Sequence, residues 1–452
     1  MPSALIYLGI MLGCICVWFL LLKRPIYEAV LVSFFTLLTV TGKWANVLGY
    51  ITEGLTTNLI YSMVAFVAMS QVLTHTKIVD SCVLIILSVL GRIRGGAGYV
   101  AVFTSSFMGA LSGSGPGNVM ATGVITIPAM KKSGFPPELA GNIESVSSCM
   151  GNMIPPSANI VAAMGAYLAL YPESELHTGT FWVILWGIAL WFILSRLIGV
   201  YAFCRHYKVK PTKKEDLPSF KQTFKDGWQA LLLPVVILLP FVLDSLLSKS
   251  YFEAQLGHEG ANMLSSSLLI TVAGFATLYA MLITKDKKSV SLSTLANIFS
   301  EGCKSLSSVV ATCMFGYMIG ALFADLHVAD DMLHFIEGLS FGKLGMCLFI
   351  PFLTCFLGMI IPGSSQVVMF GPVFISSFAA VGVNPLLAAA MLPCICGTMS
   401  GFTPPLALGM YAGMSLSGAD FSKTVKNDLW WVALQYILEV VILLGWLPIL
   451  GI

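Results

Sequence analysis

The sequence predicts an all-α polytopic membrane protein, and three observations support this prediction. Of the 452 residues, 57% are hydrophobic and only 10% are charged, whereas a soluble globular domain carries about 25% charged residues. The mean hydropathy is +0.87. Apolar runs recur along the whole chain, and because one membrane helix needs ~20 residues, the length allows on the order of a dozen crossings. These observations exclude a soluble enzyme and a disordered protein, and the net charge of +2 is too balanced for a nucleic-acid partner.

The distribution of charge predicts the sidedness of the chain, because Lys and Arg concentrate in cytoplasmic loops. Lys23 and Arg24 close the first apolar segment, so we expect the N-terminus outside. The loop 204–226 carries seven Lys or Arg residues against three Asp or Glu residues and is expected in the cytoplasm. The acidic or neutral loops 171–180 and 250–262 then lie outside. The sequence therefore predicts a multi-pass protein of the inner (cytoplasmic) membrane, embedded in lipid.

The apolar runs fall into two kinds. Ordinary membrane spans are expected near 57–74, 97–111, 344–361 and 428–450. Short or interrupted runs, rich in Ser, Gly and Asn, lie near 79–91, 119–130, 139–151 and 385–398. Broken segments in a membrane protein usually line something other than lipid.

Two regions of the chain share one pattern, which predicts a duplicated architectural unit. They run from Ser112 to Tyr167 and from Ile361 to Gly413. An offset of 248 superposes Gly and Pro residues, and one inserted residue later the two Pro-Pro pairs coincide. The coinciding pairs are Gly115 and Gly363, Gly123 and Gly371, Gly134 and Gly382, Pro137 and Pro385, Ala140 and Ala388, Pro155 and Pro404, and Pro156 and Pro405.

Each copy contains two predicted breaks. The first is a Gly- and hydroxyl-rich turn, at 112–118 and at 362–366, which is typical of the tip of a hairpin that enters and leaves the membrane on one side. The second is the Pro-Pro pair. Because proline lacks the N–H that would bond the carbonyl four residues earlier, the pairs free four carbonyls, those of Gly151, Asn152, Ser400 and Gly401. Each unbonded carbonyl at membrane depth costs several kcal/mol unless water, another helix or a cation binds it.

A weakly held Na⁺ fits these groups better than a divalent metal. The 76 residues from Leu344 to Ala419 contain no Asp, Glu, Lys or Arg, whereas a strong divalent site normally uses carboxylate, imidazole or thiolate ligands. In transporters built from inverted repeats, unwound carbonyls hold the coupling ion and half-helix N-termini face the anionic substrate. The sequence contains the groups for both.

These features also have structural interpretations, which the sequence leaves open. A single Pro-Pro pair in a membrane helix is more often a plain kink, although two copies at matched spacing favour a functional role. Glu144 is a membrane-embedded carboxylate and a functional candidate, or an interfacial group. Glu439 is expected to be a packing or interfacial group. The acidic stretch 325–334 is expected to be a solvated external loop rather than a metal site.

Several motifs resemble those of a known family, over about residues 57–447. They read RGGAGYVAVFTSSFMGALSGSG, TGVITIPAMKKSGF and NMIPPS in the first half, and GMIIPG, VGVNPLLAAA and TPPLALGMYAGMSLSGAD in the second. They resemble the large membrane subunit (M subunit) of TRAP transporters, the tripartite ATP-independent periplasmic family. The resemblance implies an ion-transporter-superfamily elevator fold with inverted repeats and two re-entrant hairpins. It also implies Na⁺-coupled import of a small carboxylate without ATP.

The resemblance further implies the site residues and the partners. The first Na⁺ site would use Ser112, Ser114, Asn118, Gly151, Ile154 and Pro156. The second would use Gly363, Ser364, Ser365, Ser400, Gly401 and Thr403. Substrate-binding candidates are Asn152, Pro155, Glu144, Gln366 and Pro404. The implied partners are a secreted substrate-binding protein and a small four-helix membrane subunit, which we expect on a separate chain. The motif GMIIPG lacks the acidic residue of many dicarboxylate members and is closer to the TAXI class.

The resemblance also predicts a division of the chain into segments. These are N-terminal scaffold helices (1–56), a first repeat in the transport domain (57–180), central scaffold helices (181–300), a second repeat in the transport domain (301–427) and a C-terminal helix (428–452). The alternative is a stand-alone ion-transporter-superfamily carrier of an organic anion that works without a binding protein. A membrane enzyme is disfavoured because no HExxH or GxSxG motif occurs, and without GxxxxGK[ST] the chain is not expected to be an ATPase.

Overall fold

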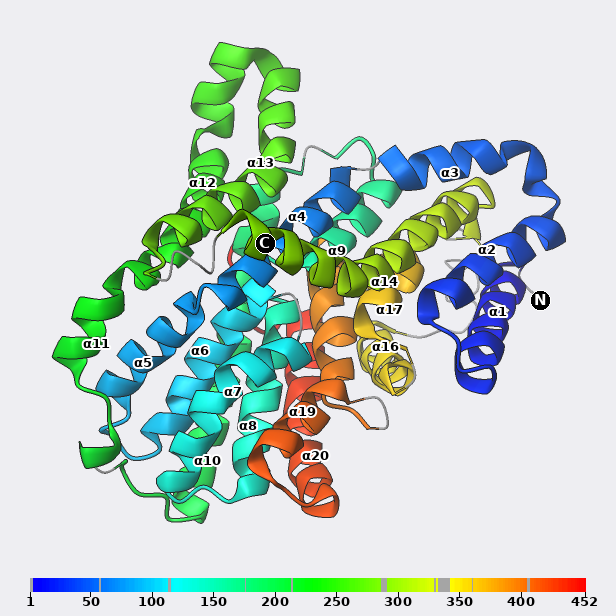
Figure 1. The fold of residues 1–452 in the computed structure, drawn as a ribbon. Helices are drawn as coiled ribbons and strands as arrows, with labels where there is room; N and C mark the ends of the chain where they lie inside the picture. The colour runs from blue at the N-terminus through cyan, green and yellow to red at the C-terminus, as the bar shows by residue number, and fades with distance from the viewer. Residues whose placement is uncertain are drawn as a thin grey trace.

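The computed structural model describes residues 3–56, 58–112, 115–174, 176–212, 214–285, 291–328, 331, 342–359, 361–404 and 407–452. Figure 1 shows that this part of the chain is built from helices, and its only strand-like feature is an isolated bridge between Arg94 and Pro211. The predicted all-α class is therefore confirmed. Among the described residues, three segments are long and apolar enough to cross a membrane alone: Thr178–His206, Phe220–Asp244 and Gly363–Ala380. A fourth is added if the bent pair Glu259–Ser265 and Ile270–Ile283 counts as one span.

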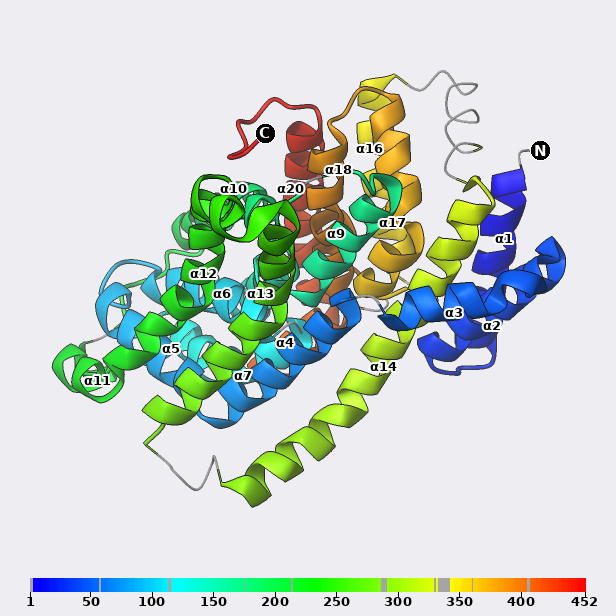
Figure 2. The ribbon, with the colours of Figure 1, turned by 90° about the horizontal axis from the view of Figure 1, so that it is seen from above.

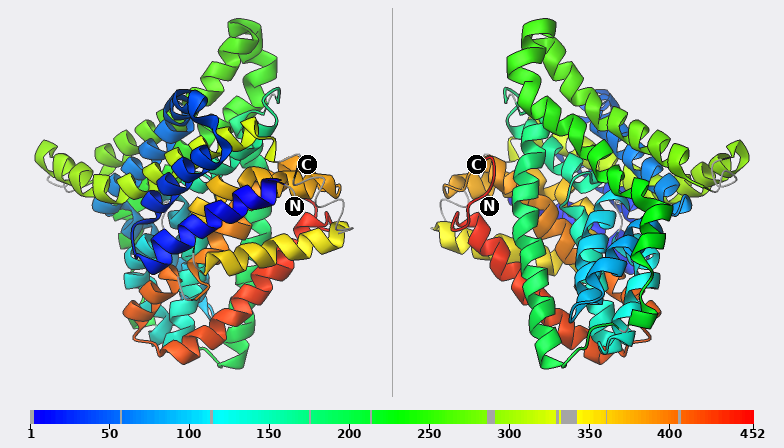
Figure 3. Two further views of the ribbon diagram at one scale, coloured as in Figure 1. Left: turned by 90° about the vertical axis from the view of Figure 1, so that its right-hand side faces the viewer. Right: turned by 90° about the vertical axis from the view of Figure 1, so that its left-hand side faces the viewer.

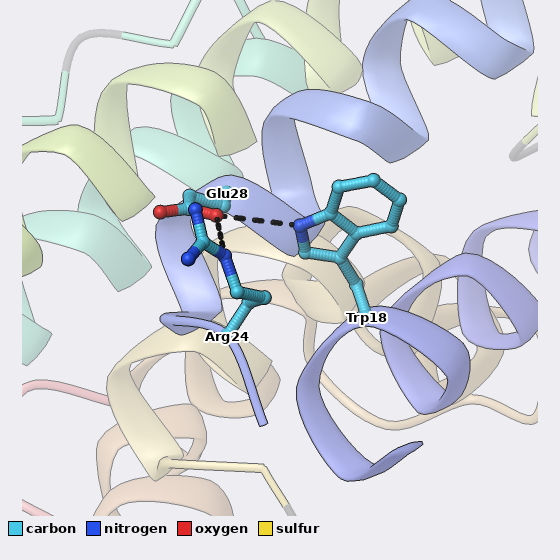
Figure 4. Close-up of polar contacts among 3 residues, drawn as sticks. All are labelled: Trp18, Arg24 and Glu28. Carbon is cyan, nitrogen blue, oxygen red and sulfur yellow. Dashed lines mark hydrogen bonds and ion pairs between the residues drawn. The ribbon is translucent and has the colours of Figure 1, made fainter. Parts of the chain in front are cut away.

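The N-terminal helices form a group beside the long helix α14 (Leu292–Asp325), as Figure 2 shows. They are α1 (Ser3–Ile15), the π-helix η1 (Cys16–Leu21), α2 (Ile26–Thr41) and α3 (Val47–Thr56). Figure 4 shows the contacts at the turn between η1 and α2, where Glu28 accepts hydrogen bonds from Arg24 Nε at 2.9 Å and Trp18 Nε1 at 3.4 Å. A second polar contact ties the group to the end of α14, because Asp325 Oδ2 accepts from Tyr50 at 2.5 Å.

The first repeat contains two helices that pack together across its first break. It comprises α4 (Asn58–His75), α5 (Ile78–Leu90), α6 (Gly96–Ser112), α7 (Gly115–Lys132), α8 (Pro137–Cys149), the 3₁₀ segment η3 (Met150–Asn152) and α9 (Ala158–Leu170). Helices α6 and α7 lie against each other, and α8 packs on both.

The helices of the second repeat correspond to those of the first at a nearly constant spacing along the chain. It comprises α16 (Lys343–Gly358), α17 (Gly363–Ala380), α18 (Pro385–Leu392), the π-helix η8 (Pro393–Thr398), the 3₁₀ segment η9 (Met399–Gly401) and α19 (Leu408–Ser417). Helices α7 and α17 begin and end at positions exactly 248 apart, and α8 and α18 begin 248 apart. Gly134 and Gly382 both adopt positive φ, 98° and 79°, in the turns between these helices. The structure therefore confirms the predicted duplication, and the apolar run near 344–361 becomes the 16-residue α16 because the helix ends before the second tip.

The inserted residue of the second copy coincides with a π-helix. Segments η3 and η9 are 249 residues apart rather than 248, so the insertion lies between the start of α18 and η9. The π-helix η8 occupies this interval. Because a π turn holds more residues than an α turn, it absorbs an extra residue without displacing the helix on either side.

Side-chain caps fix where several of these helices begin. Ser157 accepts a hydrogen bond from the Asn159 N–H at the start of α9, and Asn384 accepts from the Leu386 N–H at the start of α18. Pro137 and Pro385 occupy the first helical position of α8 and α18, where a missing N–H costs nothing. Caps and prolines in the sequence thus mark where these helices begin.

The central helices link the two repeats. They are α10 (Thr178–His206), α11 (Phe220–Gly227), α12 (Leu233–Leu247) and α13 (Glu253–Ile283). Helices α12 and α13 form the pair that projects at the top of Figure 1, and α10 runs the length of the molecule in the right view of Figure 3. The last helix, α20 (Phe421–Leu443), packs against α8, α10 and α16.

The loop 204–226, which is predicted to be cytoplasmic, lies beside two basic helix ends. Lys210 N–H donates to the Ser133 carbonyl at 3.0 Å, and Lys132 Nζ lies 3.3 Å from Asp216 Oδ1. Lys285 Nζ lies 3.0 Å from Asp226 Oδ1. The end of α7, the loop 204–226 and the end of α13 therefore share one face, as the charge pattern predicts. Which side of the membrane this face occupies stays a prediction.

Glycine permits the close crossing of α8 and α19. A Cβ on Gly413 would lie 2.6 Å from the Gly141 carbonyl oxygen and 2.3 Å from Ser145 Oγ, so any larger residue must push the two backbones apart. Ser145 also donates to the Gly409 carbonyl at 2.9 Å across this contact. The crossing thus depends on the absence of a side chain.

We expect Gly413→Ala to lower the thermal unfolding temperature of the purified protein in detergent. Overpacking of this kind costs about 1–3 kcal/mol, and the clash with a backbone oxygen leaves no side chain to rotate away. The matched control is Gly274→Ala in α13, where nothing lies within 4 Å of the added Cβ. A Gly413→Ala protein as stable as the control would show that the two helices separate at no cost.

Candidate functional site

The two proline-containing breaks meet inside the molecule. Asn152 Nδ2, in the first break, donates to the Gly397 carbonyl of the second repeat at 2.8 Å. A Cβ on Gly397 would lie 3.2 Å from Asn152 Cβ and 2.8 Å from Asn159 Nδ2. Pro155 and Pro156, joined by a cis peptide bond, are both buried. The structure therefore brings two sites that are about half the chain apart in sequence into direct contact.

The carbonyls that the prolines are predicted to free receive none of the turn and loop hydrogen bonds formed between described backbone groups. In the first break, the Met150 carbonyl accepts from the Met153 N–H at 3.0 Å. In the second, the Met399 carbonyl accepts from the Phe402 N–H at 3.3 Å. No such bond of the described residues ends on the carbonyls of Gly151, Asn152, Ser400 or Gly401. These four oxygens are therefore candidates for binding a ligand.

The first set of predicted Na⁺ ligands is partly assembled. Asn118, in the first turn of α7, donates from Nδ2 to the Ser105 carbonyl at 2.7 Å and to Ser148 Oγ at 2.8 Å. Both amide hydrogens are used, so the amide oxygen is the atom left for a cation. A Cβ on Gly109 would touch Gly151 Cα at 3.1 Å and Asn118 Nδ2 at 3.3 Å, which shows that Asn118 and Gly151 lie close together.

The remaining members of the first set are described less completely. Ile154 and Pro156 are buried in the break. Ser114 lies outside the described residues. Ser112 ends α6, and its side chain lies outside the description as well.

The second set is brought together in the same manner. Ser400 Oγ accepts from the Gly363 N–H at 3.0 Å and donates to the Gly397 carbonyl at 3.2 Å. Thr403 donates to the Met399 carbonyl at 2.9 Å. A Cβ on Gly358 would lie 3.2 Å from Ser400 Cα, which matches the contact of Gly109 with Gly151 in the first copy.

The other predicted members lie on the same two segments. Ser365 is buried at the start of α17, and Ser364 beside it is half-buried. Gly401 and Pro404 are half-buried in the second break. The second set therefore spans the N-terminus of α17 and the break that faces it.

Gln366 presents a buried oxygen without a partner. Its Nε2 donates to the Ile361 carbonyl at 3.0 Å, whereas its Oε1 has no hydrogen-bond partner and is not exposed. A buried polar atom without a partner costs about 1–3 kcal/mol. Among the predicted substrate-binding residues, Gln366 is therefore the side chain with an atom free for a donor or a cation.

Glu144 lies in a cluster of hydroxyl groups. The side chain has no exposed surface. It accepts hydrogen bonds from Ser105 at 2.7 Å, from Thr122 and Thr126 at 2.5 Å each, and from Ser148 at 3.1 Å. Because Ser105 and Ser148 also bind Asn118, the carboxylate belongs structurally with the first set of cation candidates. Glu144 is therefore packed inside the protein, and its depth in the membrane stays a prediction.

A second buried network joins the broken helix of the second repeat to α10 and α20. Arg196 donates from Nη2 to Gln435 Oε1, and Gln435 Nε2 donates to Glu439 Oε1 at 2.8 Å and to Cys394 Sγ at 3.0 Å. All four residues are fully buried, so Glu439 packs inside the protein, in agreement with one of its two expected roles. Arg196 was missed at the level of sequence, although a single charge inside the apolar run 181–200 is a recognisable signal.

Comparison with known proteins agrees with this architecture. Residues 5–450 match the family model described as the DctM component of the tripartite ATP-independent periplasmic transporter. The chain is 22% identical to the C4-dicarboxylate TRAP transporter large permease protein DctM of Pseudomonas aeruginosa, over 78% of this chain and 76% of that protein. It is also 22% identical to the sialic acid TRAP transporter large permease protein SiaM of Vibrio cholerae, over 76% of this chain and 74% of that one.

A solved structure shares the fold. The structure of Neisseria gonorrhoeae MtrF, from a class described as antimetabolite efflux pumps, aligns with a TM-score of 0.66 at 12% identity. The alignment covers 90% of this chain and 85% of MtrF. At this identity the likeness concerns the fold alone, and it supports a helical polytopic membrane protein.

We expect Ser400→Ala to destabilise the protein even without sodium. The change leaves the buried Gly363 N–H without an acceptor, which costs about 1–3 kcal/mol. Thermal unfolding in a choline buffer measures the effect free of cation binding. The control is Ser364→Ala, a half-buried hydroxyl of the same turn, for which we expect a change within about 0.5 kcal/mol. Equal losses in both variants would mean that the Gly363–Ser400 bond does not hold the second tip.

Proposed function

This chain belongs to the DctM component family of tripartite ATP-independent periplasmic (TRAP) transporters, and from that premise we propose that it imports a small organic acid with Na⁺ by an elevator mechanism. As a large permease subunit of this family, it is a multi-pass inner-membrane protein and not an enzyme. It transports a substrate in cooperation with a binding protein and a small membrane subunit. Sodium coupling, the elevator movement and the class of substrate are the proposed part.

The observation that carries the proposal of sodium is the pair of carbonyl groups in each break that the prolines are predicted to free. Gly151 and Asn152 in one copy, and Ser400 and Gly401 in the other, offer neutral oxygens where helices have unwound. The Asn118 amide oxygen adds a further neutral ligand in the first copy. Neutral oxygens without a carboxylate suit a monovalent ion that must bind and leave in every cycle. We therefore propose two Na⁺ sites, one at each break, from the residues that the sequence predicts.

Glu144 has a distinct role in this proposal. Its two oxygens are occupied by four hydroxyl groups, so it is placed to act on the first Na⁺ through Ser148 and Asn118 rather than to contact the substrate. A buried negative charge near the site lowers the free energy of the bound cation, because interactions between charges are strong away from water. The substrate would then lie between the tips, near Asn152, Pro155, Gln366 and Pro404.

The proposed substrate is a carboxylate, as the names of the two relatives suggest for those proteins. The 76 residues from Leu344 to Ala419, which include the second tip and the second break, have no Lys or Arg to bind it. Helices α7 and α17 begin at the two tips, and the N-terminus of a helix attracts an anion through its free N–H groups. These two helix ends would hold the carboxylate, and the transport segments 57–180 and 301–427 would carry it past the scaffold.

The details of the partners and of the orientation are also proposed. A four-helix small subunit and an N-terminus outside the cell follow from the family pattern and from the gathered Lys and Arg residues of the loop 204–226. Family membership favours a carrier fed by a binding protein over a stand-alone carrier. The TAXI-like character of the GMIIPG motif stays a prediction.

Uptake should require an inward Na⁺ gradient. The test reconstitutes the permease with its small subunit and binding protein in liposomes and follows radiolabelled C4-dicarboxylates and sialic acid. We expect accumulation with Na⁺ outside and none with K⁺ outside. Uptake that continues after a sodium ionophore has collapsed the gradient would overturn the proposed coupling.

The binding of Na⁺ can be measured without knowing the substrate. Any ligand that binds only the folded protein raises its unfolding temperature, so we expect Na⁺ to stabilise the wild-type protein relative to choline. Asn118→Ala should reduce this Na⁺-induced shift, and Glu144→Gln, which keeps the shape but removes the charge, should reduce it as well. Ser267→Ala in α13, where an exposed hydroxyl donates to the Leu264 carbonyl, is the control with an unchanged shift. A full shift in both site variants would exclude the proposed first site.

A further inference from the structure

The pair formed by Asn142 of α8 and Asp428 of α20 has two buried atoms that lack partners. Asn142 Nδ2 donates to Asp428 Oδ1 at 2.9 Å. The other atom of each group, Asn142 Oδ1 and Asp428 Oδ2, is buried and has no hydrogen-bond partner. Both residues are at most 1% exposed. Two acceptor oxygens of one pair are therefore left without a donor.

A single hydrogen atom would satisfy both oxygens. If Asp428 carries a proton on Oδ2, this oxygen becomes a donor, and the Asn142 amide oxygen is the acceptor that its own pair provides. An acid and an amide then form two hydrogen bonds in a closed ring, with Nδ2–H donating to Oδ1 and Oδ2–H donating to Asn142 Oδ1. Buried polar groups are nearly always hydrogen-bonded. With Asp428 ionised, two buried oxygens of the pair lack a partner, whereas with Asp428 protonated both oxygens have one.

The surroundings of Asp428 offer little to hold a negative charge. No Lys, Arg or His nitrogen of the described residues lies within 4.0 Å of its carboxyl group. Lys423 and Lys426 of the same helix are exposed. The Asp428 carboxyl therefore receives one donor, whereas Glu144 receives four.

The ionisable groups on the elements packed against α20 do not supply the missing charge. Arg196 of α10 binds Gln435, further along α20. Helix α8 carries Glu138, Glu144 and the Cys149 thiol, which interacts electrostatically with Asp428, and η8 contributes the thiols of Cys394 and Cys396. Glu439 of α20 itself is bound to Gln435 and Cys394. Thiols and a second carboxyl group disfavour a charge on Asp428.

We propose that Asp428 is a proton-binding site, with its carboxyl group held as the neutral acid against Asn142. The site links α20 to α8, the helix that runs directly into the first break. Loss of the proton leaves a buried charge with a single donor and two acceptors facing each other. The contact between α8 and α20 then weakens, so the first break is coupled to a proton as well as to the Na⁺ of the proposed function.

The decisive variant is Asp428→Asn, because an amide forms the same closed pair without a proton. Infrared spectra of the purified wild-type protein should contain the C=O band of a protonated carboxyl group that is absent from Asp428→Asn. Raising the pH should lower the unfolding temperature of the wild-type protein more than that of Asp428→Asn. Both measurements use protein without Na⁺ or substrate, so their outcome does not depend on whether uptake is coupled to sodium.

A reciprocal exchange covers the case in which the single variant fails to fold. Asn142→Asp combined with Asp428→Asn restores an acid and an amide on exchanged helices, and we expect its infrared spectrum to regain the band. The proposal is overturned if the wild-type spectrum lacks a protonated carboxyl band assignable to Asp428, or if Asp428→Asn unfolds with the same pH dependence as the wild-type protein. Either result would mean that Asp428 is ionised in the fold.

Discussion

The structure depends on one constraint, which is that a backbone carbonyl removed from water must have a partner. Two proline pairs break this rule in two segments, and the fold places both segments in contact through Asn152 and the Gly397 carbonyl. Close approach is possible because small residues meet there; a Cβ on Gly401, for example, would lie 2.3 Å from Cys149 Sγ. The carbonyl oxygens of Gly151 and Ser400 lie in the two segments that the prolines break, so the fold brings both sets of candidate oxygens to one region.

The two copies solve the same backbone problem with different side chains. The polar network of the first copy is formed within its own repeat, since Glu144 and its four hydroxyl donors all come from α6, α7 and α8. The second copy has no charged residue and is held from outside by Arg196 of α10 and by Gln435 and Glu439 of α20. The Cys394 thiol in the π-helix is the point where this outer network reaches the break. The two copies thus share a backbone arrangement but differ in the position of their charged residues, which lie inside the first copy and on neighbouring helices for the second.

The sequence predicted the backbone of the site better than its side-chain partners, and particular residues show why. Proline acts locally, so the breaks after Met150 and Met399 and the repeat offset of 248 could be predicted from the chain alone. The bond between Arg196 and Gln435 joins residues 239 apart, and no local pattern specifies which of several buried helices Arg196 will face. Glu439 was expected to be a packing or interfacial group for the same reason: its position in an apolar helix indicates depth, but only the tertiary structure shows that Gln435 and Cys394 surround it.

Three of the buried acids among the described residues, Glu144, Glu439 and Asp428, have three different environments, and the number of donors distinguishes them. Glu144 accepts four hydroxyl groups, which is the environment that stabilises an ionised carboxylate. Glu439 accepts from the Gln435 amide and the Cys394 thiol, with Arg196 one residue beyond in the same network. Asp428 accepts a single amide hydrogen, and its second oxygen and the Asn142 amide oxygen are both buried without a partner. Because a buried charge is tolerated only where donors replace water, we infer a charged carboxylate at Glu144, beside the first break, and a neutral acid at Asp428, where α8 meets α20.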